Sequence, residues 1–115
     1  MFIRNGDNLL VMSKILVGNA SDITPGKMIK VEGFLGIADI LVTNVDGNYY
    51  AIKDTCTHAG ASLSEGSLDG STVTCPWHGS TWDCKTGKMI AFGVQLNDLS
   101  SYKVTVESDE IFVEV

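Results

Sequence analysis

The stretch CTHAGASLSEGSLDGSTVTCPWHG, residues 56–79, holds both histidines and two of the three cysteines of this 115-residue chain. Cys56 and His58 form one pair, and Cys75 and His78 form a second. The spacing within each pair lets one tight loop present both side chains to the same point. These four residues are therefore candidate ligands of a single metal centre held between two loops.

The pattern leaves more than one interpretation open. Isolated histidines are usually ordinary surface or core residues, but two mixed pairs with no histidine elsewhere point to a metal. Two cysteines and two histidines are a standard set for structural zinc, although zinc motifs usually group the cysteines together and the histidines together. One cysteine and one histidine in each loop suit a [2Fe-2S] cluster with cysteines on one iron and histidines on the other. A zinc-stabilised binding module remains the alternative to an iron–sulfur protein.

The motifs CTHAG and CPWHGSTWD resemble the two ligand loops of the Rieske iron–sulfur family, and the TGK that follows resembles the turn closing its cluster-binding part. The resemblance covers roughly residues 48–90. It implies one [2Fe-2S] cluster, with Cys56 and Cys75 on the inner iron and His58 and His78 on the outer, solvent-facing iron. Neutral imidazoles in place of two thiolates make the cluster less negative, which raises its reduction potential above that of all-thiolate ferredoxins.

Five positions bear on the reduction potential of the cluster and on the docking of a partner protein. High-potential members of that family carry an extra, disulfide-bonded cysteine in each loop, where this chain has Ala61 and Trp77. Ser80 matches a hydroxyl donor to the cluster sulfurs, but a tyrosine position is occupied by Trp82, which has no hydroxyl. Fewer donors stabilise the reduced state less, so we expect a potential nearer about −150 mV than about +300 mV. We also expect Trp77, with Ala59 and Ala61, to form an apolar docking patch around the outer iron.

Outside these loops, short β-strands alternate with turns rich in glycine and asparagine. No window shows a convincing helical period. Asp46-Gly47 is expected to form a hairpin turn, since Asp-Gly tolerates positive φ, and Ser108-Asp109 is expected to form a turn between two alternating strands. Strands are expected at 14–17, 27–31, 39–45, 49–53, 71–75, 81–84 and 88–92, and at 102–106 and 111–115, where apolar and polar residues alternate.

These strands predict an all-β fold: a Rieske-like antiparallel sandwich or barrel as the base, with a cluster-binding subdomain of two ligand loops inserted in it. The subdomain is expected at about residues 55–90 within a single domain at 12–115, with residues 1–11 as a possible extension.

Composition and charge limit the kinds of partner and the location that we expect for this chain. A net charge of −6 argues against nucleic acid, because phosphate binding needs a basic face. No stretch approaches the roughly 20 apolar residues needed to span a bilayer. Three cysteines without a secretory signal are not a disulfide framework and favour the cytoplasm, with Cys84 packing as a small hydrophobe.

The cluster would use both histidines, and none is left for the mononuclear iron of a Rieske oxygenase. The resemblance therefore implies an electron carrier and not an enzyme. This would be a soluble ferredoxin passing single electrons from a reductase to a terminal oxygenase or other acceptor. The alternative within the family is a small subunit of a larger reductase, such as nitrite reductase.

Overall fold

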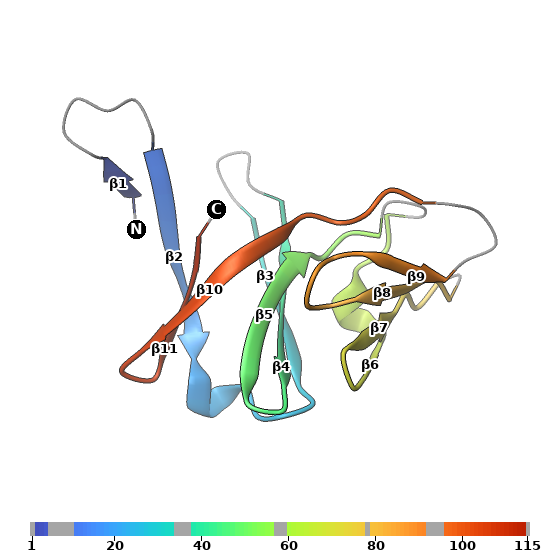
Figure 1. Ribbon diagram of the computed structural model, residues 1–115, viewed down its shortest axis with the longest axis horizontal. Helices are drawn as coiled ribbons and strands as arrows, with labels where there is room; N and C mark the ends of the chain where they lie inside the picture. Colours follow the sequence, from blue (N-terminus) through green and yellow to red (C-terminus); the bar gives the residue numbers. More distant parts are fainter. Residues whose placement is uncertain are drawn as a thin grey trace.

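Two antiparallel β-sheets make up the fold (Figure 1). The computed structural model describes residues 2–4, 11–33, 38–56, 60–77, 79–91 and 96–114, with side chains from residue 14 onward. The large sheet has the strand order β1-β2-β11-β10-β5-β4-β3, and the small sheet has the order β6-β7-β8-β9. No α-helix occurs in the described ranges, so the all-β prediction is confirmed.

The strands of the large sheet are β1 (Phe2–Arg4), β2 (Val11–Asn19), β3 (Met28–Val31), β4 (Ile40–Val45), β5 (Asn48–Lys53), β10 (Ser101–Glu107) and β11 (Glu110–Glu114). Those of the small sheet are β6 (Ser67–Asp69), β7 (Thr72–Thr74), β8 (Thr81–Asp83) and β9 (Met89–Ala91). Two single-turn 3₁₀ helices complete the described elements, η1 (Ala20–Asp22) and η2 (Leu63–Glu65).

The small sheet is inserted between two strands of the large one. The chain leaves the large sheet at the end of β5, builds η2 and β6 to β9, and returns as β10. β10 then pairs beside β5, with Tyr102 opposite Ala51. Figure 1 shows the small sheet at one end of the molecule, with β2 and β11 toward the other end. The insertion thus starts and ends on adjacent strands.

β4 separates two apolar cores, because it is buried at every position. Leu41 and Val45 face the small sheet, whereas Ile40 and Val42 face β11 across the other side, as the alternation of a strand requires. Full burial of one such aliphatic side chain stabilises a fold by about 1.5–3 kcal/mol. The core beneath the small sheet, here called the loop-side core, consists of Leu41, Val45, Ile52, Cys56, Ala61, Leu63, Val73, Cys75, Trp82, Cys84 and Leu99.

Both predicted hairpin turns are confirmed by their backbone angles. Asp46 and Gly47 join β4 to β5 with φ of +53° and +90°, and Ser108 and Asp109 join β10 to β11 with +50° and +68°. Positive φ at both central residues matches the twist of the flanking strands. The Asp109 carboxylate also accepts hydrogen bonds from the Ser21 amide, at 3.1 Å, and the Ser21 hydroxyl, at 2.8 Å. These bonds help to offset the strain at a residue without glycine's freedom.

Some strand boundaries differ from the prediction. The strand expected at 14–17 is longer, because β2 continues along β11 through an irregularity in the register beside Ile111 and Phe112. β6 was not predicted, since a three-residue strand with only Leu68 as an apolar side chain has no readable period. Residues 2–4 of the expected extension pair with the start of β2. In the part of the chain that the structure describes, no helix is long and apolar enough to cross a membrane.

Candidate metal centre

The first ligand loop, residues 55–62, is a closed hairpin whose end residues form a β-bridge. The Cys56 amide donates to the Ala61 carbonyl at 2.9 Å, and the Gly60 amide donates back to the Cys56 carbonyl at 2.9 Å. Gly60 has φ of +72°, a conformation that is strained for residues with a Cβ. Two backbone bonds and one glycine therefore define the direction of the Cys56 side chain.

The second ligand loop, residues 74–81, repeats this backbone. The Cys75 amide donates to the Ser80 carbonyl at 2.8 Å, and the Gly79 amide donates to the Cys75 carbonyl at 3.2 Å. Gly79 has φ of +75°, and the end residues pair in the ladder of β7 and β8. The two loops are therefore equivalent hairpins. This equivalence was not predicted from the sequence, although TCTHAGAS and TCPWHGST share Thr, Cys and Gly at matching places.

Of the four predicted ligands, the structure describes the two cysteines. His58 and His78 lie outside the described residues. Cys56 and Cys75 are 1% and 2% exposed, and both belong to the loop-side core. Neither forms a disulfide, and neither does the third cysteine. Among the described side chains, no three potential metal ligands gather at one point.

The sulfur of Cys56 touches the opposite loop. The Cys56 Sγ atom lies 3.4 Å from the Ser80 Oγ atom. Two buried thiols on equivalent hairpins, with a hydroxyl of one loop beside the sulfur of the other, match the needs of an iron–sulfur cluster. Iron–sulfur clusters are bound by thiolates and tuned by hydrogen bonds to their sulfurs. The described residues therefore fit the cysteine-ligated half of a [2Fe-2S] centre.

Ser80 has a second partner in Trp82. The Trp82 Nε1–H donates to the Ser80 Oγ atom at 3.1 Å, and both residues are fully buried. The indole N–H thus bonds to the hydroxyl next to the cysteine sulfur.

Asp54, which was not predicted from the sequence, anchors the first ligand loop through hydrogen bonds. Asp54 is 1% exposed, and its carboxylate accepts hydrogen bonds from the Ser62 hydroxyl at 2.5 Å and the Ser64 amide at 2.9 Å. The Asp54 carbonyl also accepts the Leu63 amide at 2.8 Å. These bonds join the residue before the loop to η2 after it. The signal in the sequence was weak: an acidic residue at the end of a strand and two serines in the loop that follows.

Gly66 links η2 to the second loop by close approach. A Cβ atom built on Gly66 would lie 1.9 Å from the carbonyl oxygen of Thr74, the residue before Cys75. Only a glycine leaves room for this backbone contact.

Of the three docking positions predicted from sequence, the structure describes Trp77 and Ala61, and these differ in exposure. Trp77 is 63% exposed, so its indole is available at the surface. Ala61 is 2% exposed and packs in the loop-side core. The expectation that Ala61 contributes to a surface patch is therefore wrong, because its small side chain is directed into the core beneath the first loop. Ala59 lies outside the described residues.

Cys84 is fully buried in the same core, in agreement with its expected role as a small hydrophobe. Burial raises the pKa of the Cys84 thiol above its ordinary value of 9.0. The side chain is therefore a neutral thiol at neutral pH.

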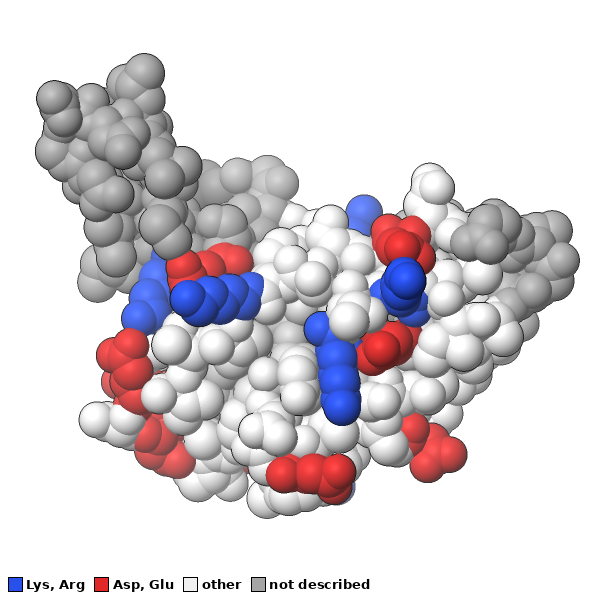
Figure 2. Space-filling view, in the orientation of Figure 1, with Lys and Arg blue, Asp and Glu red and all other residues white. Residues whose placement is uncertain are grey.

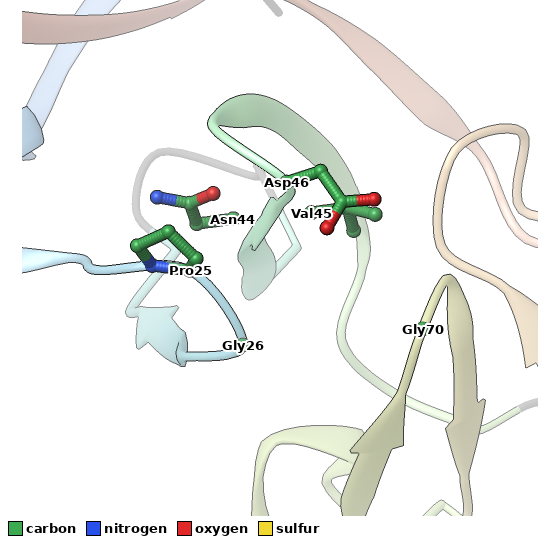
Figure 3. A pocket seen from close by; sticks show the side chains of 6 residues that line it. All are labelled: Pro25, Gly26, Asn44, Val45, Asp46 and Gly70. Atoms are coloured by element: carbon green, nitrogen blue, oxygen red, sulfur yellow. The ribbon is translucent and has the colours of Figure 1, made fainter.

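An open hollow of about 290 Å³ is lined by Pro25, Asn44, Asp46 and Gly70, among others, and Figure 3 shows these residues around it. Gly70, which lines it, is in the turn between β6 and β7, whereas Cys75 follows the opposite end of β7. The Asn44 amide on its wall is already bonded to the Ile23 carbonyl at 2.7 Å and to the Gly47 amide at 2.8 Å. Each polar atom of the Asn44 side chain therefore already has a partner within the protein.

Charges of both signs are interspersed on the face shown in Figure 2, with carboxylates along the left and lower edges and others beside the basic side chains. The chain has 14 acidic and 8 basic residues. No single-sign field covers this face, so nothing on it resembles a basic stripe for nucleic acid.

Two equivalent hairpins with buried cysteines, carried on an antiparallel β base, define a β-rich iron–sulfur protein. The pattern of the Rieske [2Fe-2S] domain family matches residues 13–103. The chain therefore belongs to the Rieske [2Fe-2S] domain family, and its cofactor is one [2Fe-2S] cluster.

Two curated relatives are ferredoxins. The chain is 42% identical to "Ferredoxin CarAc" of Metapseudomonas resinovorans over 94 residues, which cover 82% of this chain and 86% of that protein. It is 37% identical to the 3-phenylpropionate/cinnamic acid dioxygenase ferredoxin subunit of Shigella flexneri serotype 5b over 105 residues, 90% of this chain and 95% of that protein.

Solved structures agree. The structure described as a complex of reduced oxygenase and oxidized ferredoxin in carbazole 1,9a-dioxygenase contains a chain that matches with a TM-score of 0.81 and 38% identity, over 87% of this chain and 91% of that one. By contrast, the match to the terminal oxygenase of carbazole 1,9a-dioxygenase from Novosphingobium sp. KA1 has a TM-score of 0.74 and 26% identity, over 87% of this chain but 29% of that chain.

The chain thus corresponds to whole ferredoxins and to only one part of an oxygenase. It is a one-electron carrier of the ferredoxin type and is not itself an enzyme.

Proposed function

We propose that this chain delivers single electrons to the Rieske centre of a terminal oxygenase that acts on an aromatic compound. The observation that carries the proposal is the pair of equivalent hairpins that bury Cys56 and Cys75 in one core. The loop-side core holds both sulfurs, while Trp77 in the second loop is left exposed to a partner. The named relatives are ferredoxins of dioxygenase systems, which favours this function over a zinc module or a nitrite reductase subunit.

Cys56 and Cys75 would hold the inner iron of the cluster, and His58 and His78 the outer iron. The cluster supplies the one-electron couple. The protein supplies two buried thiolates, a hydroxyl at one of them, and an apolar core that keeps water from the sulfurs. The single unit at 12–115, with its cluster-binding part at about 55–90, and a cytoplasmic location belong to the same proposal.

Metal and sulfide analysis tests the centre first. The purified protein should contain about two irons and two acid-labile sulfides per chain, as a [2Fe-2S] cluster requires. The Cys75→Ala variant should contain neither, whereas Cys84→Ala should keep both, because Cys84 is buried but not a proposed ligand. A colourless wild-type protein with zinc and no sulfide would overturn the proposal.

Stopped-flow mixing tests the acceptor. The reduced protein should be reoxidised anaerobically by the oxygenase component of a carbazole or phenylpropionate dioxygenase system, with the visible spectrum of the oxidised cluster returning. Failure to transfer electrons to either oxygenase would count against the acceptor class while leaving the cluster assignment intact.

Trp77 is the docking residue we propose, because it lies exposed in the second loop next to His78. Large, partly exposed aromatic side chains commonly carry much of the binding energy at interfaces. Trp77→Ala should lower the second-order rate of electron transfer to the oxygenase by at least about tenfold, a typical loss for such a residue. Leu16→Ala is the matched control, since Leu16 is 50% exposed but lies on β2. Equal losses in both variants would refute a specific role for Trp77.

A further inference from the structure

We propose that Trp82 is a positioning residue for the redox centre, which turns the Ser80 hydroxyl toward the Cys56 sulfur and thereby raises the reduction potential. This inference rests on the proposed cluster-bearing function and deepens it. From the sequence, Trp82 was expected only to lack a hydroxyl that could donate to the cluster sulfurs. In the structure, its indole bonds to Ser80, which in turn contacts the Cys56 sulfur.

The first step is the direction of each hydrogen bond. An indole N–H can only donate, so the Ser80 oxygen must accept the bond from Trp82 Nε1 at 3.1 Å. A serine hydroxyl has one proton, and that proton is not used in the bond to Trp82. The Cys56 Sγ atom lies 3.4 Å from the same oxygen.

The second step is the state of the sulfur. By geometry alone either the Ser80 hydroxyl or the Cys56 thiol could donate in their contact. A cysteine that binds a metal is a thiolate, which has no proton and can only accept. In the cluster-bearing protein the bonds therefore run from Trp82 N–H to Ser80 oxygen, and from Ser80 O–H to Cys56 sulfur.

The third step is that water cannot replace Trp82. Trp82 and Ser80 are both fully buried, and Trp82 belongs to the loop-side core. Without the indole N–H, the Ser80 hydroxyl would lose the donor that keeps one of its lone pairs occupied, and it could rotate away from the sulfur. Consecutive hydrogen bonds also strengthen one another, so the indole makes Ser80 a better donor.

The consequence concerns the reduced state. Reduction adds negative charge to the cluster, and a hydrogen bond to a ligand sulfur stabilises that charge. A donor held in place by Trp82 therefore favours reduction, whereas a rotated hydroxyl does not.

A double-mutant cycle on the cluster-bearing protein, read by protein-film voltammetry, tests the inference. Ser80→Ala should lower the equilibrium constant for reduction about tenfold, which is about 59 mV for a one-electron couple. Trp82→Phe removes the N–H but keeps an aromatic ring, and it should lower the constant about threefold, or about 28 mV. In the Ser80→Ala background, Trp82→Phe should cause no further fall, because its effect passes through the hydroxyl.

Each other result overturns the inference. An unchanged potential in Trp82→Phe would show that the indole N–H does not matter, and a full additional fall in the Ser80→Ala background would show that Trp82 acts by another route. Leu16→Ala is the control, since it truncates an exposed apolar side chain on β2, outside the ligand loops, and should leave the potential unchanged. Iron and sulfide content measured beforehand separates these results from failure of the proposed function, in which no variant, nor the wild type, would hold a cluster.

A second replacement covers the case in which Trp82→Phe does not fold. In a Trp77→Phe variant, tryptophan can be replaced biosynthetically by its benzothienyl analogue, in which sulfur stands in place of the N–H. This substitution changes Trp82 alone and keeps its shape. The same threefold fall is expected, and an unchanged potential would overturn the inference.

Discussion

Replacing Gly66 with alanine should prevent cluster binding, although the residue lies in neither ligand loop. The new Cβ atom would stand 1.9 Å from the Thr74 carbonyl oxygen, where real Cβ contacts essentially never fall below 3.0 Å. The backbones of η2 and of the strand leading into Cys75 must therefore separate by at least about 1.1 Å, the difference between these distances. The Leu63 carbonyl, 3.3 Å from the same Cβ, limits movement in the other direction.

The size of that shift decides the outcome. Overpacking of this kind typically costs about 1–3 kcal/mol, which leaves many domains folded. Metal–ligand distances in a well-formed site, however, stay within about 0.2 Å of their normal values. A shift of at least about 1.1 Å at Thr74 exceeds that range roughly fivefold, and the neighbouring residue is the proposed ligand Cys75.

Two measurements on purified protein check this reasoning. Gly66→Ala should retain its far-ultraviolet circular dichroism but contain less than about a tenth of the wild-type iron and labile sulfide, a loss expected for a ligand displaced beyond the range of roughly 0.2 Å. Gly70→Ala is the control. It also replaces a glycine near β7, with φ of +60°, but the added Cβ atom would meet nothing within 4 Å. This control should cost about 1 kcal/mol of stability and keep its cluster. Normal cluster content in Gly66→Ala would refute the claim that η2 sets the position of the second loop.

Three further outcomes are expected. Ala61→Ser should raise the reduction potential by up to about 59 mV in voltammetry. The two loops are equivalent, so a hydroxyl at position 61 should reach the Cys75 sulfur as Ser80 reaches the Cys56 sulfur. An unchanged potential would show that only the backbones of the two loops are equivalent. Asp54→Ala should lower the urea midpoint for loss of visible absorption, corresponding to about 1–3 kcal/mol, because it removes the buried acceptor of two hydrogen bonds; an unchanged midpoint would contradict the anchoring role. Burial raises the pKa of the Cys84 thiol in the folded chain. At a pH between the unfolded and the folded pKa, the folded chain keeps a proton that the unfolded chain has released. The free energy of unfolding should therefore fall as pH rises above about 9. Thermal melts between pH 8 and 10 should show a shallower decline in Cys84→Ala, and identical slopes would contradict the assignment.

Much of the fold was predictable from local chemistry. Alternating apolar residues predicted the β10–β11 hairpin, and Asp-Gly predicted the turn between β4 and β5, because these signals depend on neighbouring residues and on the φ that each residue tolerates. β6 was missed because its stability comes from pairing with β7 and not from its own three residues. Ala61 was misplaced because a small side chain has no preference strong enough to reveal burial.

The sequence by itself determined the chemistry of the centre. The pairing of one cysteine with one histidine in each of two loops shows which side chains can bind the metal, and this information is local. Only the tertiary structure decided how the centre is held and tuned. Ser80 and Cys56 are 24 positions apart, and their contact exists because two equivalent hairpins are packed on one core. The same packing turned Trp82 from an apparent loss of a donor into the group that directs the Ser80 hydroxyl. Contacts of this kind depend on which buried polar atoms meet when separate segments share a core, and no local pattern in the chain encodes that meeting.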